Sequence, residues 1–325
     1  MVDLETINAY MARVTETETI VHKPCSNKLK VGVDLGTAYI VIVVLDEDNN
    51  PVACEKQFAQ VVKDGVLVDY GGACRILREL KKKLEDRLGV ELTEAAIAMP
   101  AGTESSTKTH KYCVEGAGFD VINVLDEPTA ANSIYGITDG VVVDIGGGTT
   151  EIACISLGGI VVSESIDVAG DVFTAEIQQY MRQQHNIKIG EVTAEMIKIN
   201  VGAAIAELDE LPEPYIVRGP NLMTAHPVEV AVTSQEIAHC LDKSLAKIET
   251  AVLAVLEQTP PELYSDIVEN GIHLAGGGSL LRGLAKRLTE KVNIPFYVAE
   301  DPLRAVARGT CLALKNTENY TFLMR

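Results

Sequence analysis

The residues best suited to chemistry lie at two turns that follow apolar runs. Residues 141–155 read VVVDIGGGTTEIACI and residues 31–45 read VGVDLGTAYIVIVVL. In both, an Asp ends a predicted strand, and Gly and Thr precede a second, antiparallel strand. Glycine lets backbone N–H groups approach phosphate oxygens, and an Asp carboxylate can hold a hydrated Mg²⁺ ion. Either turn alone fits an ordinary hairpin, but together they indicate two phosphate-binding turns.

The repetition of this order, 110 positions apart, indicates an internal duplication. A third glycine run lies in IHLAGGGSLLRGLAKRL at residues 272–288. There the pattern predicts a strand that passes directly into an amphipathic helix, with Leu280, Leu281, Leu284 and Leu288 on one face. A turn between a strand and a helix is a third place where a nucleotide can bind.

Composition limits the class of protein. The chain has 325 residues, 47% hydrophobic and 23% charged, which predicts a large folded protein of two domains. The formal net charge of −18 opposes binding to nucleic acid, so no nucleic-acid partner is expected. No apolar run approaches the roughly 20 residues of a transmembrane helix, and no secretory signal is recognised, so a cytoplasmic location is expected. The seven cysteines are scattered singly and are expected to be buried small hydrophobes.

Five segments in order resemble the superfamily of actin, sugar kinases and DnaK-type chaperones. The two Asp-Gly-Thr turns resemble its phosphate motifs, and HLAGGGSLLRGL resembles its adenosine motif. VLDEPTAANSIYGI at 124–137 and DPLRAVARGTCLAL at 301–314 resemble its two interdomain connecting helices. The resemblance implies an α/β fold with two duplicated actin-like (ribonuclease H-like) domains around a cleft that binds ATP and Mg²⁺.

The two halves of the chain resemble different relatives. Before Gly140, segments such as GVDLGTAYIVIVVLDEDNNPVA resemble the EutJ family, which is associated with ethanolamine utilisation. From Gly140 onward, segments such as GGGTTEIACISLGGIVVSESIDVAGDVFTAEI and IPFYVAEDPLRAVARG are similar to MreB-type bacterial actins.

The resemblance also implies site residues. Asp34 and Asp144 are expected to hold Mg²⁺ through water. Phosphate oxygens are expected to bind the backbone at Gly36, Thr37, Gly146, Gly147, Gly148 and Thr149, and adenosine to lie against Gly276, Gly277 and Gly278. Glu195 and Lys198, one helical turn apart, look like the pair that contacts ribose and adenine. A solvated helix salt bridge is the alternative for that pair.

Glu127, in the DEP sequence that begins the first connecting helix, is the best candidate to position the attacking water, supported by Thr149. Its alternative role is to complement the helix dipole. Asp126 competes for the catalytic role, and the sequence does not separate the two. Glu151 also matches an acidic position of some relatives.

The expected domain bounds follow from the positions of these motifs. Residues 1–28 form an appendage. Residues 29–139, completed by 302–325, form the first domain, and 140–301 form the second, with a large lobe at about 175–260. The first domain has a reduced small lobe, because Val52 to Gly65 supplies too few residues for more. Residues 211–227 are expected to be irregular or a β-hairpin.

The appendage places Leu4, Ile7, Met11 and Val14 on one helical face. This face suits a docking helix for a partner protein, and a disordered or self-packed tail is the alternative.

Three functions are compatible with these features. The first is a slow ATPase that acts as a EutJ-like chaperone or scaffold on an unidentified protein partner. The alternative is an MreB-like cytoskeletal filament protein that determines cell shape, and a small-molecule kinase is less favoured. Self-association is possible. Filaments are expected to be absent or weak, because the small lobe of the first domain is reduced.

Overall fold

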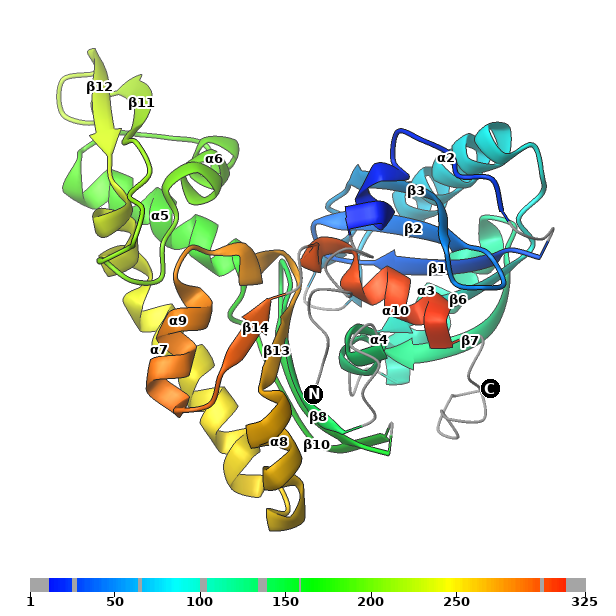
Figure 1. Ribbon diagram of the computed structural model, residues 1–325. Coiled ribbons are helices and arrows are strands. Elements are labelled where there is room, and N and C mark those ends of the chain that lie inside the picture. The colour runs from blue at the N-terminus through cyan, green and yellow to red at the C-terminus, as the bar shows by residue number, and fades with distance from the viewer. Residues whose placement is uncertain are drawn as a thin grey trace.

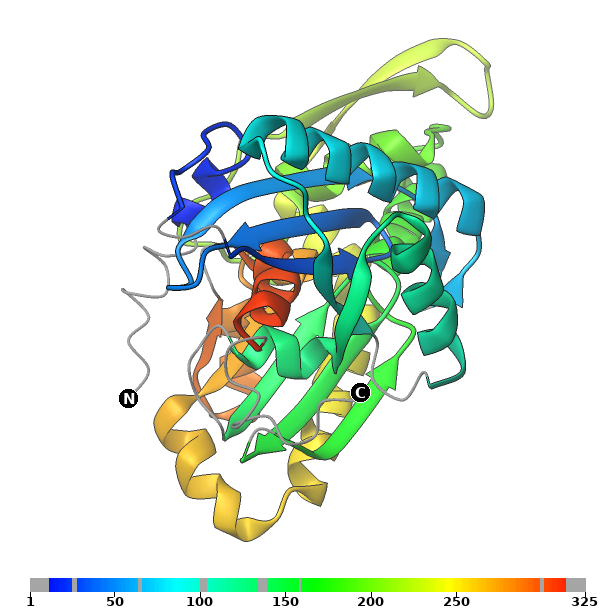
Figure 2. The same cartoon turned by 90° about the vertical axis from the view of Figure 1, so that its right-hand side faces the viewer.

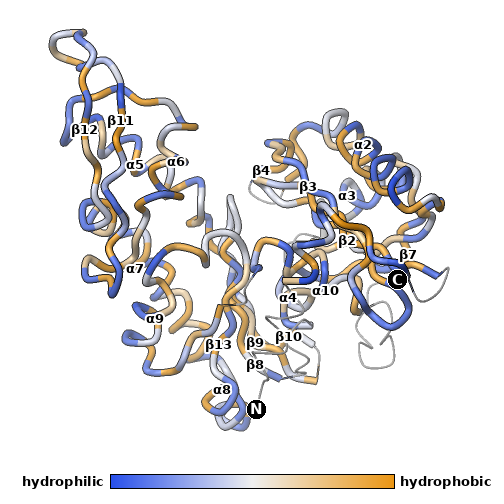
Figure 3. Tube along the Cα trace, turned by 45° about the horizontal axis from the view of Figure 1, so that its top comes forward, coloured by the Kyte–Doolittle hydropathy of each residue, from blue (hydrophilic) through white to orange (hydrophobic). Residues whose placement is uncertain are grey.

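The chain folds into two α/β halves that lie side by side (Figures 1 and 2). The structure is a computed structural model, and it describes residues 12–24, 28–63, 66–99, 104–133, 139–157, 159–298 and 301–313. Each half is built on a five-stranded mixed sheet. The apolar segments of the chain run through the sheets, and much of the hydrophilic chain lies on the surrounding helices (Figure 3).

The first sheet has the strand order β3-β2-β1-β6-β7. Its strands are β1 (Lys30–Leu35), β2 (Tyr39–Leu45), β3 (Pro51–Phe58), β6 (Glu94–Met99) and β7 (Asp120–Asp126). Strand β2 is antiparallel to both β1 and β3, whereas β6 and β7 run parallel to β1. Helices α2 (Tyr70–Leu88) and α3 (Glu104–Gly116) pack on this sheet through buried side chains such as Leu77, Leu84 and Val114.

The second sheet repeats this topology in the order β10-β9-β8-β13-β14. Its strands are β8 (Gly140–Ile145), β9 (Thr150–Ser156), β10 (Gly159–Ile166), β13 (Ile272–Ala275) and β14 (Phe296–Val298). Strands β8 and β9 are antiparallel, and β13 runs parallel to β8. The predicted pair of β-turn-β units is therefore confirmed, and so is the duplicated α/β fold class.

A lobe projects from the second half beyond the sheet. It contains α5 (Gly170–Gln184), α6 (Glu191–Val201), β11 (Tyr215–Pro220), β12 (Pro227–Val232) and α7 (Ser234–Gln258). The β-hairpin alternative for residues 211–227 is confirmed, because β11 and β12 pair in antiparallel register. In the first half, the short hairpin of β4 (Val62–Lys63) and β5 (Val66–Leu67) lies between β3 and α2.

The opposite ends of the second half are formed by different elements. The β11–β12 hairpin lies at one end, and α8 (Tyr264–Asn270), which follows the 3-10 turn η1 (Pro261–Leu263), lies at the other (Figure 1).

The prediction that the third glycine run enters a helix directly is wrong. A 3-10 turn, η2 (Gly277–Leu280), follows β13, and α9 (Leu284–Val292) begins only after Gly283, whose φ is 76°. The carbonyl of Arg282 accepts a hydrogen bond from the N–H of Ala204 (2.8 Å), so the intervening chain is held by a neighbouring segment. Leu280 is consequently 53% exposed, whereas the other three leucines of the predicted face are buried.

The described part of the appendage packs on the first half. Residues 12–16 are helical, and Val14 is fully buried against the first sheet. The carbonyl of Thr17 accepts hydrogen bonds from the N–H of Cys54 and from Arg87. Glu18 forms an ion pair with Arg304. These contacts favour the self-packed tail, while Leu4, Ile7 and Met11 lie outside the described residues.

Two helices connect the halves, α4 (Glu127–Ser133) and α10 (Ala305–Ala313), the latter after the 3-10 turn η3 (Pro302–Arg304). They cross in close contact at Gly309, where an added Cβ would lie 1.6 Å from the carbonyl oxygen of Ala130. Glycine at this position therefore allows the two backbones to touch.

Replacing Gly309 should destabilise the protein, because its Cβ would meet backbone that cannot rotate away. We expect Gly309→Ala to lower the free energy of unfolding by about 3 kcal/mol, measured by urea denaturation. Gly71→Ala is the matched control, since a Cβ there meets only the carboxylate of Asp69, at 3.9 Å, and alanine favours the helix. Equal midpoints for Gly309→Ala and the wild type would contradict the proposed close contact.

Candidate functional site

The three glycine turns converge where the halves meet. A Cβ added to Gly147 in the second turn would lie 3.1 Å from Cβ of Thr37 in the first. A Cβ on Gly276 in the third turn would lie 2.3 Å from Oδ1 of Asp144. Segments more than 100 residues apart in sequence therefore form one site, and side chains at these glycines would fill it.

Two of the turns carry N–H groups suited to an anion. In the second turn, the N–H of Gly146 donates to the carbonyl of Thr149 (2.9 Å) and closes the turn. Among the described residues, no acceptor is found for the N–H groups of the turn positions Gly36, Thr37, Gly147, Gly148 and Thr149. Unpaired amides in a glycine turn are the donors that phosphate oxygens use.

Carboxylates gather beside these amides. Asp34 lies near the end of β1 and Asp144 near the end of β8, and Glu151 is directly opposite Asp144 in the β8–β9 register. Asp144 and Glu151 are buried. Burial, together with the charge of Asp144, raises the pKa of Asp34 to about 7, and burial raises the pKa of Asp144 to about 7.

Glu127 faces the same cluster from the start of α4. Burial, followed by the charges of Glu151 and Asp34, raises the pKa of Glu127 well above its ordinary value. Asp126 behaves differently, because its Oδ1 accepts a hydrogen bond from the N–H of Thr129 (2.8 Å). Asp126 therefore caps α4, whereas Glu127 is the acid whose pKa the charges of Glu151 and Asp34 raise.

The remaining predicted residues surround these groups. Gly278 lies against Ile145, and a Cβ on Gly277 would lie 2.8 Å from Leu303 of the second connection. Glu195 and Lys198 form an ion pair of 2.7 Å on α6. Sequence reasoning missed Gly170, whose N–H donates to the carbonyl of Gly146 (3.1 Å). The signal for it was its place at the first position of α5.

A divalent cation fits this cluster through water. The described residues contain no group of three or more His, Cys, Asp or Glu side chains placed to bind a metal directly. The carboxylates of Asp34 and Asp144 repel each other and are shielded from solvent. A hydrated Mg²⁺ ion would neutralise the negative charge of both.

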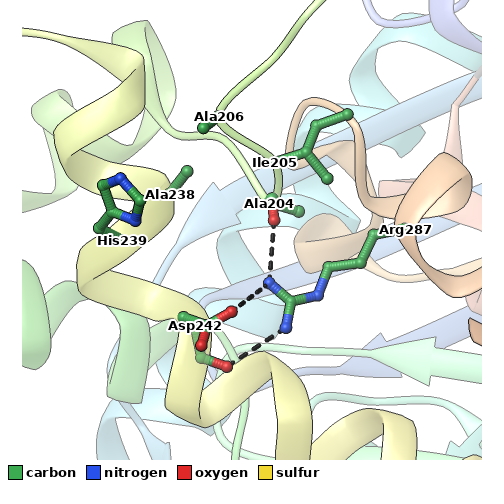
Figure 4. Close-up of a pocket in the computed structure, with 7 residues that line it drawn as sticks. All are labelled: Ala204, Ile205, Ala206, Ala238, His239, Asp242 and Arg287. Atoms are coloured by element: carbon green, nitrogen blue, oxygen red, sulfur yellow. Dashed lines mark hydrogen bonds and ion pairs between the residues drawn. The ribbon is translucent and has the colours of Figure 1, made fainter.

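Two cavities lie elsewhere in the second half. The cavity in Figure 4 is about 240 Å³ and is lined by Arg287, His239 and Asp242, among others. Arg287 already contacts Asp242, Glu249 and the carbonyl of Ala204, so its charge is neutralised within the protein. The second, of about 500 Å³, lies between α5 and residues 187–189. Neither includes a residue of the glycine turns.

The duplicated sheets, the two crossing helices and the three turns define an actin-like fold. Residues 55–321 match the family described as MreB/Mbl protein. The chain is 35% identical over 323 residues to the cell shape-determining protein Mbl of Bacillus subtilis, covering 89% of this chain and 96% of Mbl. The chain belongs to the MreB/Mbl family.

Solved structures agree with this fold. MreB 5 of Spiroplasma citri, in structures bound to AMPPNP and to ADP, matches with a TM-score of 0.78 and 28% identity, over 91% of this chain and 98% of that one. The ethanolamine utilization protein EutJ of Carboxydothermus hydrogenoformans matches with a TM-score of 0.76 and 31% identity, over 95% and 99%. The described part of our chain contains no helix long and apolar enough to span a membrane.

The carboxylate cluster should make the stability of the metal-free protein depend on pH. The pKa values of Asp34 and Asp144 rise from 3.8 to about 7 on folding. The folded state therefore binds these protons more tightly, and the free energy of unfolding should fall as pH rises from about 4 through 7. Each pKa unit corresponds to about 1.4 kcal/mol. Urea denaturation in EDTA at pH 5 and pH 8 measures the change.

Asp144→Asn removes one titrating carboxyl and relieves Asp34, so this variant should lose less stability between the two pH values. An equal loss in the variant and the wild type would contradict the assigned cause.

Proposed function

We propose that the chain binds ATP with Mg²⁺ at the convergent turns, hydrolyses it slowly, and assembles with further copies of itself as a cytoskeletal protein. The observation that carries this proposal is the meeting of two amide-lined glycine turns with the paired carboxylates Asp34 and Asp144. The nucleotide-bound structures of MreB 5 support it, because they share the fold over 91% of this chain.

The proposed roles follow from position. Backbone amides at Gly36, Thr37 and Gly146 to Thr149 would hold phosphate oxygens, and Gly276 to Gly278 would line the adenosine. Bound Mg²⁺ would supply charge neutralisation at the phosphates. Glu127 would orient the attacking water and accept its proton, for which a raised pKa is suited, and Thr149 would support the water. Asp126 is not proposed for this role, since its carboxylate caps α4.

The comparisons favour an MreB-like cellular role over the EutJ-like role that the sequence analysis puts first. A EutJ-like chaperone or scaffold in ethanolamine utilisation was expected, with an MreB-like cytoskeletal protein as the alternative. The family match begins at residue 55 and so includes much of the half that resembles EutJ. The relatives named for cell shape, such as Mbl, support the alternative, and we propose a role in determining cell shape.

Assembly would use the two ends of the second half. Head-to-tail polymers need complementary surfaces at opposite ends of the subunit. At the tip of the β11–β12 hairpin, Met223 is 81% exposed, and on α8, Val268 is 59% exposed. The β11–β12 hairpin and α8, which carry these two side chains, lie at opposite ends of the second half (Figure 1), which supports stacking along this axis despite the reduced small lobe of the first half.

Binding of ATP-Mg²⁺ should stabilise the folded protein. At ATP-Mg²⁺ near one hundred times Kd, the free energy of unfolding should rise by about 2.7 kcal/mol, measured by thermal denaturation. Asp144→Ala should abolish the shift, because it removes a carboxylate of the cation site. A wild-type melt that ATP-Mg²⁺ leaves unmoved would refute the proposed site.

The rate of ATP hydrolysis should distinguish the role of Glu127 from that of Asp126. Glu127→Ala should keep the ATP shift but lower phosphate release by roughly a hundredfold. Asp126→Ala is the matched control, expected to lose about 1 kcal/mol of stability as a helix cap while it retains hydrolysis. The reverse pattern would transfer the catalytic role to Asp126.

Assembly should depend on the two ends. Met223→Asp and Val268→Asp should each raise the critical concentration at least tenfold in sedimentation with ATP-Mg²⁺, because a buried unpaired charge is costly at a contact. Tyr112→Asp, an exposed position on α3 of the other half, is the control and should assemble normally. Absence of polymers in negative-stain images of the wild type would instead support the EutJ-like role.

A further inference from the structure

Two cysteine thiols of the first half are in contact. Cys74 lies on α2 and Cys113 on α3, and their Sγ atoms are 3.1 Å apart. Cys113 is fully buried, and Cys74 is 4% exposed. Among the six cysteines that the structure describes, this is the one pair whose sulfurs are in contact. The two helices therefore bring together two thiols that are 39 residues apart in the chain.

Hydrogen bonds on both sides of the thiols fix the register of the two helices. On one side, the hydroxyl of Tyr70 donates to the carbonyl of Tyr112 (3.0 Å). On the other side, Nε and Nη2 of Arg78 donate to the carbonyl of Gly116 (3.0 and 2.6 Å). Residues 70, 74 and 78 are spaced four apart, so they lie on one face of α2. The contact between the sulfurs is thus held by neighbours one turn before and one turn after Cys74.

A disulfide bond would need only a small further approach of the two sulfurs. Bonded sulfurs lie about 2.05 Å apart, so Cys74 and Cys113 would have to close by about 1 Å from their separation of 3.1 Å. Rotation about the Cα–Cβ bonds of two short side chains can supply a movement of this size. The bond can therefore form while the two helices keep their register.

The two thiols differ in how an oxidant reaches them. Gly116 is exposed, and a Cβ placed on it would lie 3.6 Å from Sγ of Cys74, so no side chain at this position covers that sulfur. Burial, followed by the hydrogen bond with Cys74, raises the pKa of the Cys113 thiol. Because the thiolate is the nucleophile, Cys113 is unsuited to react first.

We propose that Cys74 and Cys113 are an oxidative modification site, at which a peroxide converts the two thiols into a disulfide that fastens α3 to α2. The chain between the two cysteines contains β6 and most of both helices. Closing this loop restricts the unfolded chain and therefore stabilises the packing of α3 on the first sheet. The inference does not depend on the binding of nucleotide.

The reaction has two steps. The thiolate of Cys74 attacks one oxygen of hydrogen peroxide, the O–O bond breaks, and the leaving hydroxide takes up the thiol proton and departs as water. The thiol of Cys113 then attacks the sulfenic sulfur, so that the S–S bond forms and the S–O bond breaks. The sulfenic oxygen leaves as a second water with the proton of Cys113. Two electrons pass from the sulfurs to the peroxide, and a thiol reductant reverses the modification.

The first test locates the bond in the wild-type protein. The folded protein is treated with hydrogen peroxide, its remaining thiols are alkylated, and its peptides are mapped by mass spectrometry without reduction. We expect a linked pair of peptides that contain Cys74 and Cys113, which dithiothreitol separates. Cys154, which is buried with no sulfur in contact among the described residues, is the internal control and should be alkylated. Recovery of Cys74 and Cys113 as alkylated thiols, or a link from either to a different cysteine, would overturn the proposal.

The second test determines which thiol reacts first, with dimedone as the label for sulfenic acid. Cys113→Ala should accumulate the label at Cys74, because no second thiol removes the sulfenic acid. Cys74→Ala should leave Cys113 unlabelled, because that thiol is fully buried. Label at Cys113 in Cys74→Ala, or its absence from Cys74 in Cys113→Ala, would contradict the assigned order.

The third test measures whether the bond fastens α3. In the peroxide-treated wild type, the amides of Cys113 and Val114 should exchange with solvent about tenfold more slowly than in the reduced protein. Peroxide-treated Cys74→Ala is the control and should exchange at the rate of its own reduced form. Equal exchange rates in the linked and the reduced wild type would refute the proposed fastening of α3 to α2.

Discussion

The site is governed by the repulsion among carboxylates gathered where the halves meet. Asp34 and Asp144 occupy equivalent strand ends of the two duplicated units, so bringing the units together brings their charges together. Glu151 stands opposite Asp144, and Glu127 faces them from α4. Acids removed from water in this way must either retain protons or share a cation. The proposed magnesium nucleotide would satisfy that requirement, because it would supply the cation and place phosphates against the glycine amides.

The fold permits this crowding by bringing backbones into direct contact. Gly309 lets the two connecting helices touch, and Gly276 lets the third turn lie against Asp144. The appendage strengthens the same junction, because Thr15 donates to Asp301 (2.6 Å) and Glu18 pairs with Arg304. The junction is therefore fixed by close contacts, while the lobe reaches the first half through side chains of α6.

The features that could be predicted from the sequence are those that residues close together in the chain determine. An apolar run, an Asp and a glycine turn are contiguous, so both β-turn-β units and the fold class could be predicted. Prediction from the sequence failed where distant segments decide the structure: the chain after Gly278 is held by Ala204, which delays α9. The sequence also left open whether the appendage docks on a partner or packs on the chain itself, because the strands of the first sheet that cover Val14 are distant in sequence. Likewise, the spacing of Glu195 and Lys198 predicted their pairing, but Gly170 as the lysine's acceptor depends on how α5 packs on α6. The two acids at 126 and 127 needed the cap geometry to be distinguished.

The most direct test of the account is the number of protons released when preformed Mg²⁺-nucleotide binds, measured by calorimetry in buffers of different ionisation enthalpy. With Asp34 and Asp144 titrating near pH 7 in the free protein, a bound cation must displace their protons. We predict release of about one proton or more at pH 6, falling toward zero at pH 9, and a smaller release for Asp144→Asn. Binding at pH 6 without proton release, or with equal release in the variant, would contradict the claim that these carboxylates receive the cation.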